Sequence, residues 1–131
     1  CELPDPQSPD TFLHSHLSWD YRQGQGATLL AYYRHLIHFR KTRPAMQGMN
    51  REDLHLNPVE GQTLSFERKI INDHIYVWLH FGVSPVTIHM DNNCPMRKVF
   101  DSAAGEWLGR GASENVFELQ PYSAIICEKI L

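Results

Sequence analysis

The chain has 131 residues, 42% of them hydrophobic and 21% charged, which is typical of a globular domain and sufficient for one hydrophobic core. Twelve lysines and arginines against 15 aspartates and glutamates give a net charge of −3, which argues against a nucleic-acid binder. We expect no membrane partner, because no stretch approaches the roughly 20 apolar residues of a membrane span. The length also excludes a complete (β/α)8 barrel, which needs about 250 residues.

The three cysteines, Cys1, Cys94 and Cys127, form neither an even disulfide set nor a CxxC pair. Free thiols are typical of a reducing compartment, so we predict a cytoplasmic protein with no signal peptide. Cys127 lies in an apolar run, where a cysteine usually behaves as a small core side chain.

Eight histidines include two closely spaced pairs, His14 with His16 and His35 with His38. A zinc site needs three or four converging ligands, and neither pair has a further ligand at matching spacing. We therefore predict no metal site and no other cofactor, and we interpret these histidines as exposed or hydrogen-bonded side chains.

Proline and glycine dominate the first 26 residues, with Pro4, Pro6 and Pro9 near the start and Gly24 and Gly26 at the end. Proline at this density favours extended and turn conformations, so we predict a long irregular segment. Such long loops are uncommon inside a compact domain and are often functional or part of a larger structure.

Residues 27–41 have the periodicity of a helix that ends before Pro44. Its apolar stripe consists of Leu29, Leu30, Tyr33, Leu36 and Ile37. Tyr32 and Phe39 widen this arc to about half of the circumference, more than one packing partner usually requires. Two interpretations remain open: a wide core face, or a helix that is covered from two directions.

The rest of the chain alternates in the manner of β-strands. The two clearest strands are predicted at residues 64–70 and 74–81. Asn72 and Asp73 between them are typical of a turn, so the two strands are predicted to form a hairpin. Alternation places Ile75 and Val77 on one face of the second strand and Trp78 on the other. Further runs lie at residues 86–90, 97–101, 116–119 and 123–128, with a glycine-rich loop between 103 and 115. We predict a mainly β fold: an antiparallel β-sandwich of about six to eight strands preceded by an irregular segment and one amphipathic helix.

No motif for nucleophilic catalysis or phosphate binding is present. The acidic residues give no readable catalytic pair of the kind that glycoside hydrolysis requires. Asp5, Asp10 and Asp20 are interpreted as turn formers and helix caps. On the strands, outward-facing, solvated positions are predicted for Glu67, Glu118 and Glu128.

Flat aromatic rings can stack on the apolar faces of glucose units. Trp78, on its strand, and Trp107, in the glycine-rich loop, are candidates for this role. The alternative is an internal packing position, which we favour for Trp78 and leave open for Trp107.

Two stretches resemble known enzymes. Residues 4–12 read PDPQSPDTF and are followed by LSW at 17–19, similar to a segment of maltooligosyltrehalose trehalohydrolases. Residues 29–45 read LLAYYRHLIHFRKTRPA, similar to the signature that ends the barrel in family 13 glycoside hydrolases of the α-amylase superfamily. The β region, with FDS at 100–102 and LQPYSA at 119–124, resembles the C-terminal sandwich of the same enzymes.

This resemblance implies that residues 1–43 are the last loop and helix of a catalytic barrel and that residues 44–131 are a C-terminal accessory domain. The parent enzyme would cleave the α-1,4 bond next to a terminal trehalose, and its catalytic residues would lie outside this chain. The barrel would then be an intramolecular partner, and maltooligosyltrehalose or another α-glucan the substrate. Asp5 and Gln7 match motif positions that border the substrate cleft.

A rival hypothesis is an α-glucan-binding module. In that case exposed Trp107 and Tyr122 would hold the sugar chain. An aromatic row on an open face favours this rival, whereas inward-turned aromatic side chains favour the accessory domain.

Overall fold

The computed structural model describes residues 5–16, 23–48, 50–58, 61–88, 95–109, 111 and 118–130. The helices are α1 (Pro9–Ser15), α2 (Gly24–Thr42) and α3 (Pro44–Gln47), with 3-10 turns η1 (Arg51–Asp53) and η2 (Gly105–Trp107). The strands are β1 (Leu54–Leu56), β2 (Thr63–Ile70), β3 (Asp73–His80), β4 (Val86–Thr87), β5 (Met96–Asp101), β6 (Glu118–Leu119) and β7 (Ala124–Lys129).

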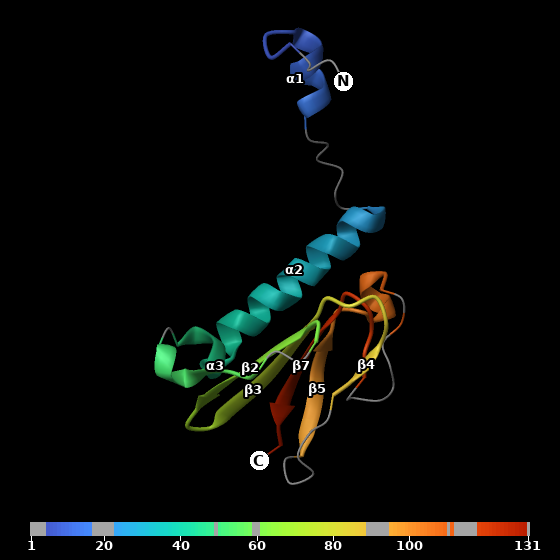
Figure 1. The fold of residues 1–131 in the computed structure, drawn as a ribbon. Coiled ribbons are helices and arrows are strands. Elements are labelled where there is room, and N and C mark those ends of the chain that lie inside the picture. Colours follow the sequence, from blue (N-terminus) through green and yellow to red (C-terminus); the bar gives the residue numbers. More distant parts are fainter. Residues whose placement is uncertain are drawn as a thin grey trace.

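Five strands form an antiparallel sheet in the order β1-β2-β3-β7-β5, and β4 pairs with β6 in a second sheet (Figure 1). The predicted hairpin is confirmed: Thr63 pairs with His80 and Ile70 with Asp73, with a two-residue turn between the strands. The mainly β, antiparallel fold class predicted from the sequence is therefore confirmed, and β1 and η1 are additions to it.

Alternation along β3 builds two cores, one on each face of the large sheet. Ile75 and Val77 belong to a buried cluster that α2 and α3 cover. Trp78, 6% exposed, faces the opposite way and packs with Leu119 of β6 and Ile125 of β7. The expectation that Trp78 occupies an internal interface is confirmed, so its ring is not available to a ligand.

The N-terminal segment is more regular than predicted, because it contains α1. Pro9 occupies the first turn, where a missing N–H costs nothing, and the Ser8 hydroxyl accepts a hydrogen bond from the Asp10 N–H at 3.3 Å. No residue of α1 is buried. In Figure 1 this helix lies beyond the N-terminal end of α2, away from the sheet.

Helix α2 begins at Gly24, three residues before the predicted start, so both glycines expected in the irregular segment lie in its first turn. Its end is as predicted. Pro44 disfavours helical geometry at the preceding residue, and Arg43 adopts an extended conformation with φ −92° and ψ 118°. The chain turns at Arg43 into α3, whose Ala45 is fully buried against the sheet.

Candidate functional site

One face of α2 packs on the large sheet. Tyr32, Leu36 and Phe39 lie against the buried cluster that includes Phe100. The His35 ring stacks on Phe100 with ring centroids 5.6 Å apart. This face shares only Leu36 with the apolar stripe identified in the sequence.

The remaining apolar arc of α2 points away from the sheet. We call it the open apolar stripe: Leu29, Leu30, Tyr33 and Ile37, which are 58%, 37%, 57% and 51% exposed. Of the stripe identified in the sequence, only Leu36 packs on the sheet, so the interpretation of the whole arc as one wide core face is wrong. Periodicity locates an apolar arc but does not tell which half of a wide arc meets the sheet. Of the two interpretations, the structure favours a helix with a second apolar face left for another partner.

The corner between α2 and α3 is fixed to the sheet by an ion-pair network around Arg43. Its guanidinium donates hydrogen bonds to the carboxylates of Asp73 on β3 and Glu128 on β7. Asp73 also accepts a bond from the Ala45 N–H at 2.9 Å, and Glu128 accepts one from Arg97 Nε at 2.8 Å. The network sets where α2 lies on the sheet, and therefore which way the open apolar stripe points.

Glu128 was predicted to be solvated, and this is wrong: it is 7% exposed. Burial by itself would raise the pKa of Glu128, but hydrogen bonds from Arg97 and Arg43 hold the pKa below its ordinary value. Burial likewise opposes the charge of Arg43, yet the bonds to Asp73 and Glu128 raise the pKa of Arg43 overall. Glu128 can be buried because its carboxylate pairs with Arg43, which is distant in the sequence. Strand alternation does not predict such a long-range partner.

A pocket of about 470 Å³ lies between the N-terminal half of α2, η2 and the turn before β7. We call it the α2–η2 pocket. Three rings line it, Tyr32, Trp107 and Tyr122, together with the polar side chains of Gln25, Thr28 and Ser102. It therefore brings together the two residues, Trp107 and Tyr122, that the sequence analysis named for sugar stacking.

Asp101 and the glycine-rich loop position Trp107. The buried Asp101 carboxylate accepts a bond from the Ala103 N–H at 2.9 Å and pairs with Lys98 at 2.8 Å, which fixes the turn into η2. Gly109 then passes so close to Ala103 that a Cβ on it would lie 2.3 Å from the Ala103 carbonyl oxygen. The half-buried Trp107 ring packs edge-on against Tyr32 at 5.4 Å.

Two residues of the pocket wall have unusual backbone geometry. Leu108 (φ 60°) and Tyr122 (φ 53°) are the two non-glycine residues with positive φ in the part of the chain that the structure describes. Both side chains are more than 60% exposed. Strained conformations of this kind cost about 1–3 kcal/mol and concentrate at binding and catalytic sites.

Asp5 and Gln7 are exposed and lie in the segment before α1, outside the α2–η2 pocket. The Asp5 carboxylate accepts a hydrogen bond from the Gln7 N–H at 2.9 Å, and the Asp5 carbonyl oxygen accepts one from the Thr11 hydroxyl. These bonds give the segment its turn. A cleft-bordering role for the two side chains stays a prediction.

The remaining candidates are placed as follows. Cys127 is buried and free, whereas Cys1, Cys94 and Asp20 lie outside the described residues. Within the described ranges, no three histidine, cysteine or acidic side chains gather as a metal site would require. The same ranges include no helix that is long and apolar enough to cross a membrane.

Comparison with known proteins gives three results. No family model matches the chain. Over 54 residues, 40% of the chain, it is 41% identical to a malto-oligosyltrehalose trehalohydrolase of Deinococcus radiodurans. The resemblance to the trehalohydrolases is confirmed. The matched stretch spans only 9% of that relative.

A solved structure shares the fold. It is a crystal structure from Salmonella typhimurium described as a "Putative alpha Amylase", with a TM-score of 0.71 and 18% sequence identity. The similarity covers 98% of this chain but 20% of the Salmonella chain. The present chain thus has the fold of a region of an amylase-like protein and corresponds to a small part of each relative.

Proposed function

We propose that this chain is a non-catalytic C-terminal domain of a larger glycoside hydrolase. The parent enzyme cleaves the α-1,4-glucosidic bond next to a terminal trehalose and releases trehalose. Support comes from the trehalohydrolase match and from the small share of each relative that the chain spans. In this proposal residues 1–43 complete the catalytic barrel and residues 44–131 form the accessory domain.

The observation that carries the proposal is the open apolar stripe. Helix α2 is already held on the sheet by Tyr32, Leu36 and Phe39, so the stripe is a second apolar face on one helix. Burial of one such side chain stabilises a structure by roughly 1.5–3 kcal/mol. A catalytic barrel supplied by the rest of the polypeptide would bury this face and lock the two domains together.

The Ile37→Lys substitution tests this role, with His38→Lys as its matched control. Both positions are exposed on α2, but His38 lies outside the stripe. In the 131-residue chain neither change should alter stability by more than about 0.5 kcal/mol. In the parent polypeptide, Ile37→Lys should lower the free energy of unfolding by about 2–3 kcal/mol, because it removes buried apolar area and buries a charge.

Thermal unfolding is measured for the four variants, two in the 131-residue chain and two in the parent, and for both unsubstituted proteins. Equal melting shifts for Ile37→Lys and His38→Lys in the parent would contradict the proposal. A parallel assay adds maltooligosyltrehalose to the 131-residue chain and measures trehalose, of which we expect none. Turnover by the chain alone would overturn the non-catalytic role.

The second candidate is an α-glucan-binding module, favoured by the α2–η2 pocket with Trp107 and Tyr122 in its wall. The two functions use adjoining surfaces of α2 that share Leu29, which lines the pocket and belongs to the open apolar stripe.

A further inference from the structure

We infer that the partner surface that covers the open apolar stripe is acidic as well as apolar, and that its carboxylates pair with Arg34, Arg40 and Lys41 of α2. The inference rests on the proposed function for the origin of that surface, which is the rest of the parent polypeptide. The position of the three cations on α2 carries the choice of an acidic partner.

Charge is distributed unevenly along the chain. Residues 21–51 contain six of the 12 lysines and arginines and none of the 15 aspartates and glutamates. The whole chain nevertheless has a net charge of −3, so a cationic segment is joined to a strongly acidic remainder. Helix α2 lies inside this segment and contains three of its cations, Arg34, Arg40 and Lys41.

The three cations surround Ile37, which belongs to the open apolar stripe. Residues three and four positions apart are neighbours on the surface of a helix. Arg34 precedes Ile37 by three positions, and Arg40 and Lys41 follow it by three and four. The remaining neighbour of this kind, Tyr33, is itself part of the stripe. Any surface that buries the exposed Ile37 side chain therefore also meets three positive charges.

The chain does not neutralise these charges itself. All three side chains are exposed, and among the described residues none of them has an ion-pair partner. Arg43, just beyond the helix, differs because its guanidinium pairs with Asp73 and Glu128. The cations of α2 are therefore available to carboxylates from outside the chain.

Stabilisation of the helix accounts for only part of the pattern. Cations in the last turn interact favourably with the helix dipole, which applies to Arg40 and Lys41. Arg34 lies about two turns before the end of α2, where this effect has faded. Arg40, three residues from Ile37 and seven from Tyr33, lies within the arc of the stripe rather than on the opposite side of the helix.

An apolar partner surface without acidic groups would not fit this half of α2. Removal of a guanidinium or ammonium group from water is unfavourable unless a counter-charge pairs with it. Carboxylates satisfy both groups, and they can bind an arginine through two parallel hydrogen bonds. No lysine or arginine lies between Gly24 and Tyr33, so the other half of the stripe needs only apolar contacts. A partner that is apolar at one end and acidic at the other would also fix the direction in which α2 docks.

Lys41 makes an acidic partner directly detectable, because it is the single lysine of α2. A water-soluble carbodiimide joins an amine to a carboxylate without a spacer, so it reports groups in contact. The parent polypeptide is treated with this reagent, digested and examined by mass spectrometry. We expect a cross-link from Lys41 to an aspartate or glutamate outside residues 1–131, and its loss in Lys41→Arg. The absence of such a cross-link in the unsubstituted parent would overturn the inference.

Lys69 is the control for the cross-link. It is exposed on β2, and its neighbour Ile70 packs in the cluster that α2 covers, so Lys69 faces the other side of the sheet. We expect no cross-link from Lys69 to a residue outside 1–131. Equal external cross-linking of Lys41 and Lys69 would show unspecific reaction and would also overturn the inference.

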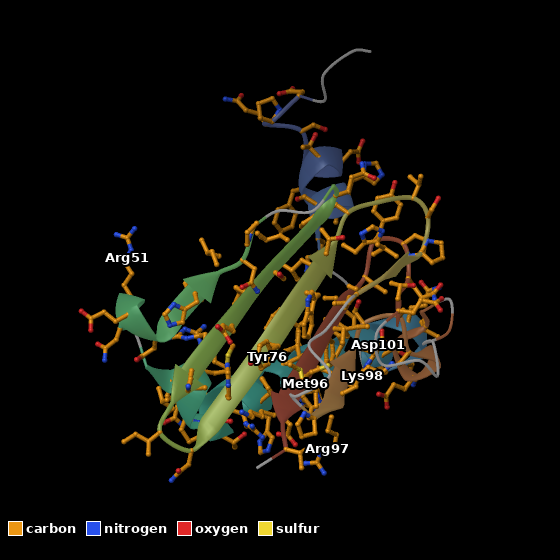
Figure 2. All side chains as sticks on the ribbon, turned by 60° about the horizontal axis from the view of Figure 1, so that its bottom comes forward. Arg51, Tyr76, Met96, Arg97, Lys98 and Asp101 are labelled. Atoms are coloured by element: carbon orange, nitrogen blue, oxygen red, sulfur yellow. The ribbon has the colours of Figure 1, made fainter. Side chains whose placement is uncertain are left out.

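Charge reversal provides a second readout. Arg40→Glu should lower the unfolding midpoint of the parent by about 3 °C more than that of the 131-residue chain, where it affects only the helix itself. This excess should shrink as NaCl is raised from about 0.05 M to about 0.5 M, because salt screens the charges. Arg51→Glu is the matched control, since Arg51 is exposed on η1 and points away from the sheet in Figure 2. Equal effects of Arg40→Glu and Arg51→Glu would contradict the inference.

The proposed function and this inference can be told apart when they fail. If Ile37→Lys destabilises the parent but Arg40→Glu has no excess effect and Lys41 gives no external cross-link, α2 docks without acidic partners and only the inference fails. If Ile37→Lys has the same effect as His38→Lys, the proposed function fails as well.

Discussion

Replacement of Arg43 by methionine should destabilise the chain more than any other single change in its ion-pair network. The substitution keeps the aliphatic part of the side chain and removes the guanidinium from two carboxylates, Asp73 and Glu128, that are 8% and 7% exposed. Each carboxylate retains one other partner, the Ala45 N–H for Asp73 and Arg97 for Glu128. Neither is left without any hydrogen bond.

The magnitude follows from these contacts. A hydrogen bond to a charged group is worth about 1.5–3 kcal/mol, and loss of one partner of a buried pair costs roughly 3–5 kcal/mol. Because the Arg43 side chain is 28% exposed and water can reach part of the vacated space, we expect the lower end, about 3 kcal/mol. Domains of this size are stable by only about 5–15 kcal/mol in total.

Arg97→Met is the matched control. Arg97 binds the same Glu128 carboxylate but is 70% exposed, and Figure 2 shows it near the start of β5. Exposed pairs contribute about 0–1 kcal/mol, so this variant should lose less than about 1 kcal/mol. Urea unfolding followed by circular dichroism gives both free energies.

A double-mutant cycle combines each arginine substitution with Glu128→Gln. It measures the coupling energies of the Arg43–Glu128 and Arg97–Glu128 ion pairs separately. We expect a coupling energy with Arg43→Met of about 1–3 kcal/mol and a smaller one with Arg97→Met. If Arg43→Met and Arg97→Met cost the same, burial is not what gives the Arg43 network its strength, and the account of the α2–α3 corner is wrong.

Two further predictions concern titration. The pKa of Glu128 is lower in the folded chain than its ordinary value of 4.5, so its contribution to stability is complete above about pH 4.5 and is lost as pH falls through the folded-state pKa. Acid unfolding curves should therefore be flatter for Glu128→Gln, and parallel curves would contradict this. Burial raises the pKa of the Cys127 thiol to about 11. In a Cys1→Ser, Cys94→Ser background, a thiol reagent at pH 8 should modify Cys127 only after denaturant is added, and rapid modification of the folded chain would show that the thiol is accessible.

Local patterns alone predict much of this fold. Period-two alternation identifies β2 and β3 and assigns Trp78 to the face opposite Ile75, because adjacent strand residues must point to opposite sides. Apolar periodicity and proline sterics predict a helix over residues 27–41 that ends before Pro44, but not its first turn from Gly24. The sequence analysis did not predict the short α1, because Pro4, Pro6 and Pro9 indicated an irregular segment.

Long-range packing decided what local patterns leave open. The apolar arc of α2 is visible in the sequence, but whether Leu29 or Phe39 meets the sheet depends on how the helix is rotated, which the Arg43 network and the Phe100 cluster fix. Glu128 has the strand position of a solvated residue and is buried because Arg43 arrives from 85 residues away.

The α2–η2 pocket likewise depends partly on residue type and partly on long-range packing. Trp107 and Tyr122 are recognisable in the sequence as ring-bearing loop residues, yet they are 15 positions apart and separated by a strand. The sequence determines which side chains can stack, hydrogen-bond or carry charge, because these are properties of residue type. Only the tertiary structure determines which of them meet, because the turn at Ala103–Gly109 and the rotation of α2 are set by contacts between distant parts of the chain.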